Sequence, residues 1–316
     1  MASYYFYLDS MEVGVASETK IQHAKLLDDS DSYAIGDIVE AWDHVFRWDA
    51  DCVSNATMAK WRFLGDELAD TALPIIMEDH GDDGERDLFA RLEAAANADK
   101  PDRHVTDLWQ KLTNIDDTKF SYDREQITRG QAVFWRYAPQ ILASLLQFSL
   151  AAGFSSPSIS RVLNLTSYLV PPMESTPKGE APRISKASNE RTYQRLLETT
   201  QFVLDCMSED AMEVQGCGWR AAVRVRLLHA TMRQRLLVKI RTALVNLPNP
   251  PYIEARDGLP ISQEDYVATL TSFGGFPLLN LMKVGVRPTL QECEDYTALW
   301  KVIGYYIGRV TVIDAV

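Results

Sequence analysis

Long stretches of the sequence carry apolar residues every three to four positions, and this helical spacing constrains the fold more than any other feature. Two long patterns are Asn189–Ser208 and Trp219–Asn246. A third, Gln131–Phe154, becomes almost continuously apolar, as expected of a buried helix. The alternation that marks β-strands is nearly absent, so the sequence predicts a mainly α protein.

Proline and N-cap residues predict where several of these helices end and begin. The run Leu247–Pro251 (LPNPP) ends the second long helix, because proline cannot donate to the helical hydrogen-bond ladder. The Lys100–Pro101 step separates two short amphipathic helices within Asp87–Lys111. Ser262 is predicted to cap a further helix, with Asp265 in its first turn.

A segment rich in proline, serine and charge, Pro171–Ser188, is predicted to be a loop or surface linker between two helical halves. The chain has 316 residues, a length that suits one large domain or two ordinary ones. We expect a single large helical domain, with an N-terminal helical cap region at residues 1–130 and a helical core at residues 131–316.

The charge and the apolar stretches exclude several classes of protein. The formal net charge of −12 argues against general nucleic-acid binding, because a phosphate-binding surface needs a positive excess. The N-terminus lacks the basic and apolar regions of a secretory signal. The most apolar stretches, Ile141–Phe154 and Leu227–Val245, are too short or too often interrupted by Arg and Lys to span a bilayer. We therefore expect a cytoplasmic protein without a transmembrane segment.

One predicted helix carries a marked excess of positive charge. Trp219–Asn246 contains seven Arg or Lys residues and no acidic residue. Helical spacing places Arg226 and Arg233 on the same face as His229, which emerges from an apolar stripe. Haem would use such a face, since its iron accepts a neutral imidazole nitrogen and its propionates prefer guanidinium partners. The spacing alone leaves open that His229 is a hydrogen-bonded core residue and that the arginines meet acidic neighbours or solvent.

The preceding helix brings two further polar residues onto one face. Arg195 and Thr199 stand four residues apart among apolar neighbours. Beside a haem they would supply a hydrogen-bond donor and a hydroxyl on the open side of the iron, where oxygen must be oriented. In the structural alternative, Arg195 pairs with a carboxylate such as Glu190 and Thr199 bonds back to its own helix. The pattern by itself does not decide between the two.

Six pieces of the sequence stand in an order that carries a family resemblance. They are Gly65–Asp70 (GDELAD), Phe148–Leu169 (FSLAAGFSSPSISRVLNLTSYL), Arg195–Leu204 (RLLETTQFVL), Val225–Arg233 (VRLLHATMR), Leu259–Phe273 (LPISQEDYVATLTSF) and Glu292–Gly308 (ECEDYTALWKVIGYYIG). Together they cover most of the chain, from about Asp66 to Arg309. Their succession is similar to that of the latex-clearing-protein family, bacterial haem enzymes that cleave polyisoprene, and of related fungal oxygenases that cut prenyl chains.

The resemblance implies that His229 is the proximal ligand of a haem b iron and that Arg233 is its companion one turn later. It also implies that Arg195 and Thr199 lie close to the haem pocket. Glu198 is a departure, since rubber-cleaving members carry there a lysine that caps the distal side of the iron. A carboxylate would leave the sixth position to water or oxygen, or act as a base toward an allylic proton. The sequence also ends short of the further helices that we expect to close the domain.

These observations lead to the hypothesis of a haem b-dependent oxygenase that uses dioxygen to oxidise or cleave an alkene in an apolar substrate such as an isoprenoid. Its residues are His229 for the iron, Arg226 and Arg233 for the propionates or the groups behind them, Arg195, Thr199 and Glu198 as catalytic candidates, and Phe148, Phe202, Leu228 and Met232 as pocket lining. The alternatives are a peroxide-using haem enzyme of a biosynthetic pathway, a non-catalytic haem carrier or gas sensor, and a helical interaction protein without a cofactor.

Overall fold

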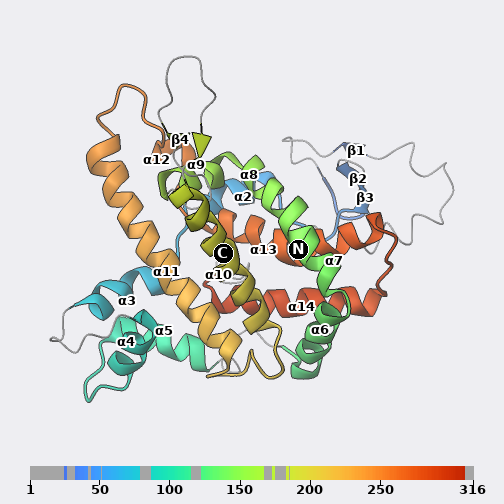
Figure 1. The fold of residues 1–316 in the computed structure, drawn as a ribbon, viewed down its shortest axis with the longest axis horizontal. Helices are drawn as coiled ribbons and strands as arrows, with labels where there is room; N and C mark the ends of the chain where they lie inside the picture. The colour runs from blue at the N-terminus through green and yellow to red at the C-terminus, as the bar shows by residue number, and fades with distance from the viewer. Residues whose placement is uncertain are drawn as a thin grey trace.

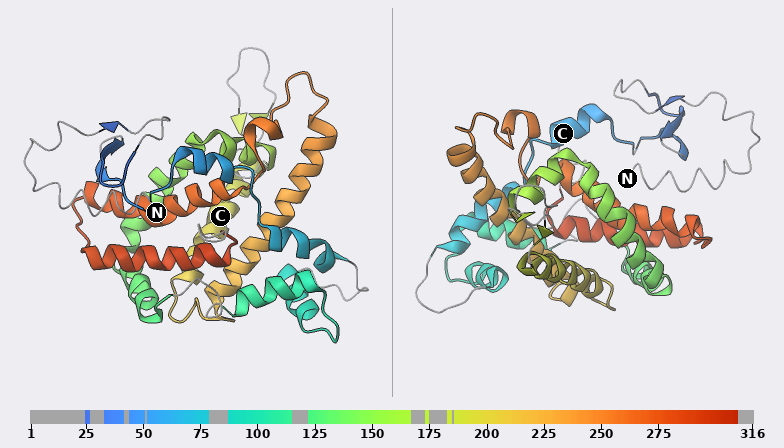
Figure 2. Two further views of the ribbon diagram at one scale, coloured as in Figure 1. Left: turned by 180° about the vertical axis from the view of Figure 1, so that it is seen from behind. Right: turned by 45° about the horizontal axis from the view of Figure 1, so that its top comes forward.

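The computed structural model describes residues 25–26, 33–41, 44–50, 52–78, 87–114, 122–166, 173–174, 183–184 and 186–309. Within these residues the chain is mainly helical (Figures 1 and 2), which confirms the predicted fold class. None of the described helices combines the length and the apolar character needed to cross a lipid bilayer.

The elements follow one another from the N-terminal to the C-terminal side of the described chain. The strands are β1 (Lys25–Leu26), β2 (Ile38–Ala41), β3 (His44–Arg47), β4 (Met173–Glu174) and β5 (Arg183–Ile184). The first helices are α2 (Asn55–Trp61), α3 (Glu67–Met77), α4 (Leu88–Ala96), α5 (Arg103–Thr113), α6 (Arg124–Arg136), α7 (Ala138–Ser144), the π-helix η3 (Leu145–Ser149), α8 (Leu150–Ser155) and α9 (Pro157–Thr166). The later ones are α10 (Lys186–Cys206), α11 (Cys217–Lys239), the π-helix η4 (Ile240–Leu244), α12 (Glu254–Asp257), α13 (Gln263–Lys283) and α14 (Leu290–Tyr306).

The predicted helix boundaries are confirmed where a capping residue or a proline sets them. The helix expected after Ser262 is α13, and it begins with a reciprocal capping box in which Ser262 and Asp265 each accept from the other's backbone N–H. The Lys100–Pro101 step separates α4 from α5. The two long patterns correspond to α10 and to α11 with η4.

Two regions differ from the prediction. A three-stranded sheet, in the order β1-β2-β3, lies where we expected only helices. Its antiparallel pair β2–β3 places Val39 opposite Phe46, and both side chains are buried. The alternation was missed because each strand is only four residues long. The apolar run Gln131–Phe154 is not one helix, since α6 ends at Arg136 and α7 restarts at once with Pro139 in its first turn.

The core lies where α14 packs along α6 and is flanked by α13 and α11. Its largest fully buried side chains include Trp219, Tyr296, Tyr306 and Phe134. The division into a cap and a core stays a prediction, and its boundary between residues 130 and 131 lies within α6. Most of the predicted linker between the two halves lies outside the described residues, apart from the β4–β5 pair and the start of α10.

The helices α10 and α11 form an antiparallel hairpin that carries most of the predicted site residues. At the closed end of the hairpin the backbones touch, because a Cβ on Gly218 would lie 2.7 Å from the Cα of Cys206. Only glycine allows this approach. From that contact the two helices run side by side toward the upper part of Figure 1.

Candidate functional site

A buried ion pair joins the start of α3 to the middle of α11. The guanidinium of Arg226 donates to both carboxylate oxygens of Asp66, from Nε at 2.6 Å and from Nη2 at 2.8 Å. The two side chains are only 4% and 3% exposed. Asp66 also caps α3 by accepting from the backbone N–H of Ala69. The ion pair therefore fixes the start of α3 against the middle of α11.

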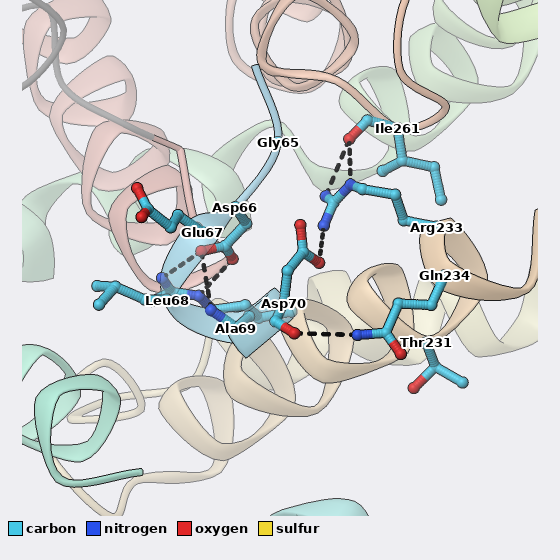
Figure 3. A network of polar contacts seen from close by, with 12 residues as sticks. Gly65, Asp66, Glu67, Leu68, Ala69, Asp70, Thr231, Arg233, Gln234 and Ile261 are labelled. Atoms are coloured by element: carbon cyan, nitrogen blue, oxygen red, sulfur yellow. Dashed lines mark hydrogen bonds and ion pairs between the residues drawn. The ribbon is translucent and has the colours of Figure 1, made fainter. Parts of the chain in front are cut away.

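A second arginine of α11, two turns later, is held by three groups, of which Figure 3 shows Asp70 and Ile261. Arg233 donates to Asp70 at 2.5 Å, and its Nη2 and Nε donate to the carbonyl of Ile261 at 2.9 and 3.2 Å. Its Nη2 also lies 3.4 Å from the hydroxyl of Tyr266. The neighbouring Gln234 donates to the backbone carbonyl of Asp70 at 3.0 Å. Asp66 and Asp70 both belong to the GDELAD segment. This segment therefore supplies the negative charges that neutralise two arginines of α11.

Gly308 packs directly against the first ion pair. It has a φ of +96°, and a Cβ on it would lie 2.1 Å from Oδ2 of Asp66 and 2.9 Å from Nε of Arg226. Gln263 donates to its carbonyl at 3.0 Å and to that of Gly65 at 2.9 Å. The loop after α14 therefore closes over the ion pair, and only a residue without a side chain fits there.

We expect Gly308→Ala to destabilise the fold by about 2–3 kcal/mol, because it forces strained backbone and displaces the buried carboxylate. The matched control is Gly153→Ala in α8, where a Cβ would meet nothing within 4 Å. Alanine there should be neutral or slightly stabilising. Urea unfolding of both variants measures the difference, and equal midpoints would refute the close packing at Gly308.

His229 stands between the two arginines on α11. Its ring lies 5.4 Å from the ring of Tyr266 on α13, at an angle of 51°. The residue is half-buried, but its Nδ1 is enclosed and has no hydrogen-bond partner among the described residues. Burial and, to a smaller extent, the charge of Arg233 lower the pKa of the imidazole to about 4. The ring is therefore neutral at pH 7, the form in which an imidazole binds metal.

The low pKa of His229 predicts a loss of stability in acid. Between its usual pKa of 6.5 and about 4, the unfolded chain takes up a proton that the folded chain does not. The contribution of His229 to the free energy of unfolding is thus fully present above pH 6.5 and declines as the pH falls toward 4, by on the order of 3 kcal/mol. Urea unfolding at several pH values should show this decline in the wild type and a smaller one in His229→Gln. Identical pH profiles in the wild type and the variant would show that His229 does not cause the loss of stability in acid.

Arg309 is a site residue that the sequence analysis missed. Its Nε is buried and has no hydrogen-bond partner in the described chain, and burial lowers the pKa of its guanidinium. It follows Gly308 directly, and its Cδ lies 3.7 Å from the position of a Cβ on Gly304, which would also contact Leu270. Leu270 is one turn of α13 beyond Tyr266. A buried cationic nitrogen without a partner is costly, and the described residues place no carboxylate against this Nε, so an anionic group would be favourable there.

The three residues of α10 lie on its accessible side. Arg195 donates to Glu198 at 2.6 Å, with the two side chains 44% and 59% exposed. The hydroxyl of Thr199 donates to the carbonyl of Arg195 at 2.9 Å. The back-bonding expected in the structural alternative is therefore present, and Arg195 pairs with a carboxylate, although with Glu198 instead of Glu190. None of the three forms a hydrogen bond with His229 in the described part of the chain.

The hairpin nevertheless places these residues at the level of His229. Arg195 lies eleven residues before Cys206, and His229 lies eleven residues after Gly218. Because Cys206 and Gly218 touch, equal distances along two antiparallel helices bring Arg195 and His229 to the same height. Of the predicted pocket-lining residues, Phe148 and Leu228 are 51% and 45% exposed. Large apolar side chains are thus accessible on η3 and on α11 beside His229.

Of the other histidines, only His104 has a described side chain. His104 is exposed at the start of α5, and His23 and His80 lie outside the described residues. The described residues contain no group of three or more His, Cys, Asp or Glu side chains placed to hold a metal ion. A haem iron needs no such group, since a single axial side chain binds it.

Comparison with known proteins places the chain in a family. Residues 135–313, more than half of the chain, match the model of the family described as ER-bound oxygenase mpaB/B'/Rubber oxygenase, catalytic domain. A rubber oxygenase of Streptomyces sp. (strain K30) is 27% identical over 117 residues, which are 36% of this chain and 26% of that protein. The chain thus matches only about a quarter of the length of this relative. No solved structure matches. The extent of the family match shows that the chain belongs to the family of mpaB-type and rubber oxygenases.

Proposed function

We propose that the protein is a haem b-dependent oxygenase that uses dioxygen to oxidise or cleave an alkene in an apolar substrate such as an isoprenoid. The observation that carries the proposal is the state of His229. Its imidazole is neutral, it has an enclosed nitrogen without a partner among the described residues, and it stands on a helix that the buried Arg226–Asp66 pair and the partly buried Arg233–Asp70 pair tie to α3. A metal ligand needs this combination of a free lone pair and a fixed position.

The chain offers side chains of the kinds that a haem group needs. A porphyrin requires an apolar surface for its face, one axial donor and cationic partners for its two propionates. Leu197, Leu228 and Phe148 offer exposed apolar surface on α10, α11 and η3. His229 is the proposed axial donor. Arg309, whose buried Nε has no hydrogen-bond partner among the described residues, is the proposed partner for a propionate. When bound, haem would supply a redox-active iron for the activation of dioxygen.

We propose a role for Arg226 and Arg233 that differs from the contact with propionates expected from the sequence. Every guanidinium nitrogen of Arg233 is engaged by Asp70, Ile261 or Tyr266, and Arg226 holds Asp66 through two nitrogens. We therefore propose that Arg226 and Arg233 hold α11 in place and so position His229. Direct contact with propionates is assigned to Arg309 instead.

Arg195, Glu198 and Thr199 remain the catalytic candidates. Their place on α10 at the height of His229 would put them beside a ligand held between the two helices. In this proposal the guanidinium of Arg195 orients oxygen, and the Thr199 hydroxyl donates to it once released from the Arg195 carbonyl. Glu198, freed from Arg195 when that side chain turns to oxygen, would be the candidate acid or base for proton transfer at the substrate.

Spectra and product formation test the proposal on the purified full chain. A Soret band that shifts on reduction with dithionite and again with carbon monoxide would establish a histidine-ligated haem b. Products from an isoprenoid alkene in air with catalase present, and none without oxygen, would support the oxygenase. Turnover that needs peroxide would favour the peroxide-using enzyme. Reversible binding of oxygen without any product would favour a carrier or sensor, and a protein without a Soret band would refute the haem proposal.

A further inference from the structure

The far end of α11 carries a cluster of exposed apolar side chains. This end, with η4 and the segment up to Ile253, projects beyond the other helices at the upper left of Figure 1 and the upper right of the first view in Figure 2. Val238, Val245, Leu247 and Ile253 are 64%, 58%, 45% and 39% exposed. Single exposed apolar residues are ordinary, but four within sixteen positions form a patch. We call residues 235–253 the α11 tip.

The α11 tip carries apolar side chains on two sides, and the rest of the described chain covers only one of them. Leu236 and Ile240 face inward and pack in a cluster with Tyr252. Val238 near the end of α11 and Val245 directly after η4 are both exposed. A helix that ends on the surface normally turns polar residues outward. The outer apolar face therefore has no partner in the described chain and is suited to an apolar medium or ligand outside it.

The charge of the tip is opposite to that of the whole chain. Residues 235–253 hold Arg235, Lys239 and Arg241 and no carboxylate, in a protein with a net charge of −12. Arg235 is exposed and makes no ion pair among the described residues. Lys239 is exposed and donates to the carbonyl of Leu165, and Arg241 pairs with Glu254. Cations thus border the apolar patch.

We propose that the α11 tip docks on an anionic lipid surface. Its aliphatic side chains would enter the interface between headgroups and acyl chains, and its cations would contact the phosphates. Cations next to exposed aliphatic side chains, in a protein that is otherwise acidic, favour an anionic lipid surface as the occupant. The proposal does not depend on haem. It would also bring α11, and hence His229 nine residues before Val238, close to a reservoir of apolar molecules.

Vesicle flotation of the full chain tests the inference without any substrate. We expect the protein to float with phosphatidylcholine vesicles that contain about 30% phosphatidylserine, and to float weakly with pure phosphatidylcholine. Binding should fall as salt is raised, since exposed charges are screened. A chain that floats with neither kind of vesicle would overturn the proposal, whatever the result of the haem measurements.

Three variants locate the contact on the molecule. Val245→Asp with Leu247→Asp should weaken binding by about tenfold or more, and Arg235→Glu with Lys239→Glu by on the order of tenfold. The control is Val284→Asp, whose side chain is 62% exposed just after α13, on the opposite side of the molecule in Figure 1. It should bind as the wild type does. Equal loss in the control, or no loss in either tip variant, would overturn the proposal. So would a dimer in solution that the tip variants abolish while the wild type fails to bind vesicles, since the tip would then join two copies of the chain.

Discussion

Replacing His229 by alanine is expected to reduce the Soret absorbance per protein by at least about tenfold, because the variant lacks the proposed axial donor. Loss of a group that merely orients such a ligand commonly costs 10- to 100-fold in metal affinity, so loss of the ligand itself should cost no less. The ion pairs Asp66–Arg226 and Asp70–Arg233, which hold α11 on α3, do not involve the imidazole of His229. Circular dichroism should therefore show an intact helical fold.

Two further variants make this result specific. His104→Ala removes an exposed histidine at the start of α5 and should leave the spectrum unchanged. In His229→Gly, added imidazole should restore part of the Soret band, since a free imidazole can occupy the space of the lost side chain. If His229→Ala kept the wild-type spectrum, His229 would not be the haem ligand. The membership of the chain in the family would not be affected.

Asp66→Asn is expected to destabilise the fold by about 3–5 kcal/mol, the largest stability effect that the structure predicts. The substitution keeps a side chain that can cap α3 but leaves the guanidinium of Arg226 buried without a counter-charge. Removing one partner of a buried pair costs far more than the pair contributes as a whole. Urea unfolding followed by circular dichroism measures the change.

Asp87→Asn is the matched control for this measurement. Asp87 also caps a helix, α4, and also pairs with an arginine of α11, Arg224, but this pair is 34% and 50% exposed. Its loss should cost less than about 1 kcal/mol. The double variant Asp66→Asn with Arg226→Met should recover much of the stability lost in Asp66→Asn, because it removes the unpaired charge. A cost for Asp66→Asn as small as that for Asp87→Asn would show that burial of the pair is not what makes it important.

Local sequence determined the helices, because the signals that start and stop them act within one or two turns. Ser262 and Asp265 cap α13 through atoms three residues apart, and proline at 101 keeps α4 and α5 separate. The strands β2 and β3 could not be recognised in the same way. Each offers only four residues, and their pairing was decided by burying Val39 and Phe46 together.

The sequence alone also placed His229 between two arginines on one helical face and set Arg195 and Thr199 on the neighbouring helix. Only the tertiary structure decided what those cations do. Arg226 and Arg233 meet carboxylates 160 and 163 residues away, and the Nε of Arg309, next to Gly308, is buried without a hydrogen-bond partner among the described residues. The physical reason is that helical periodicity depends on near neighbours, whereas the cost of a charge depends on whether distant segments bury it and what they place beside it.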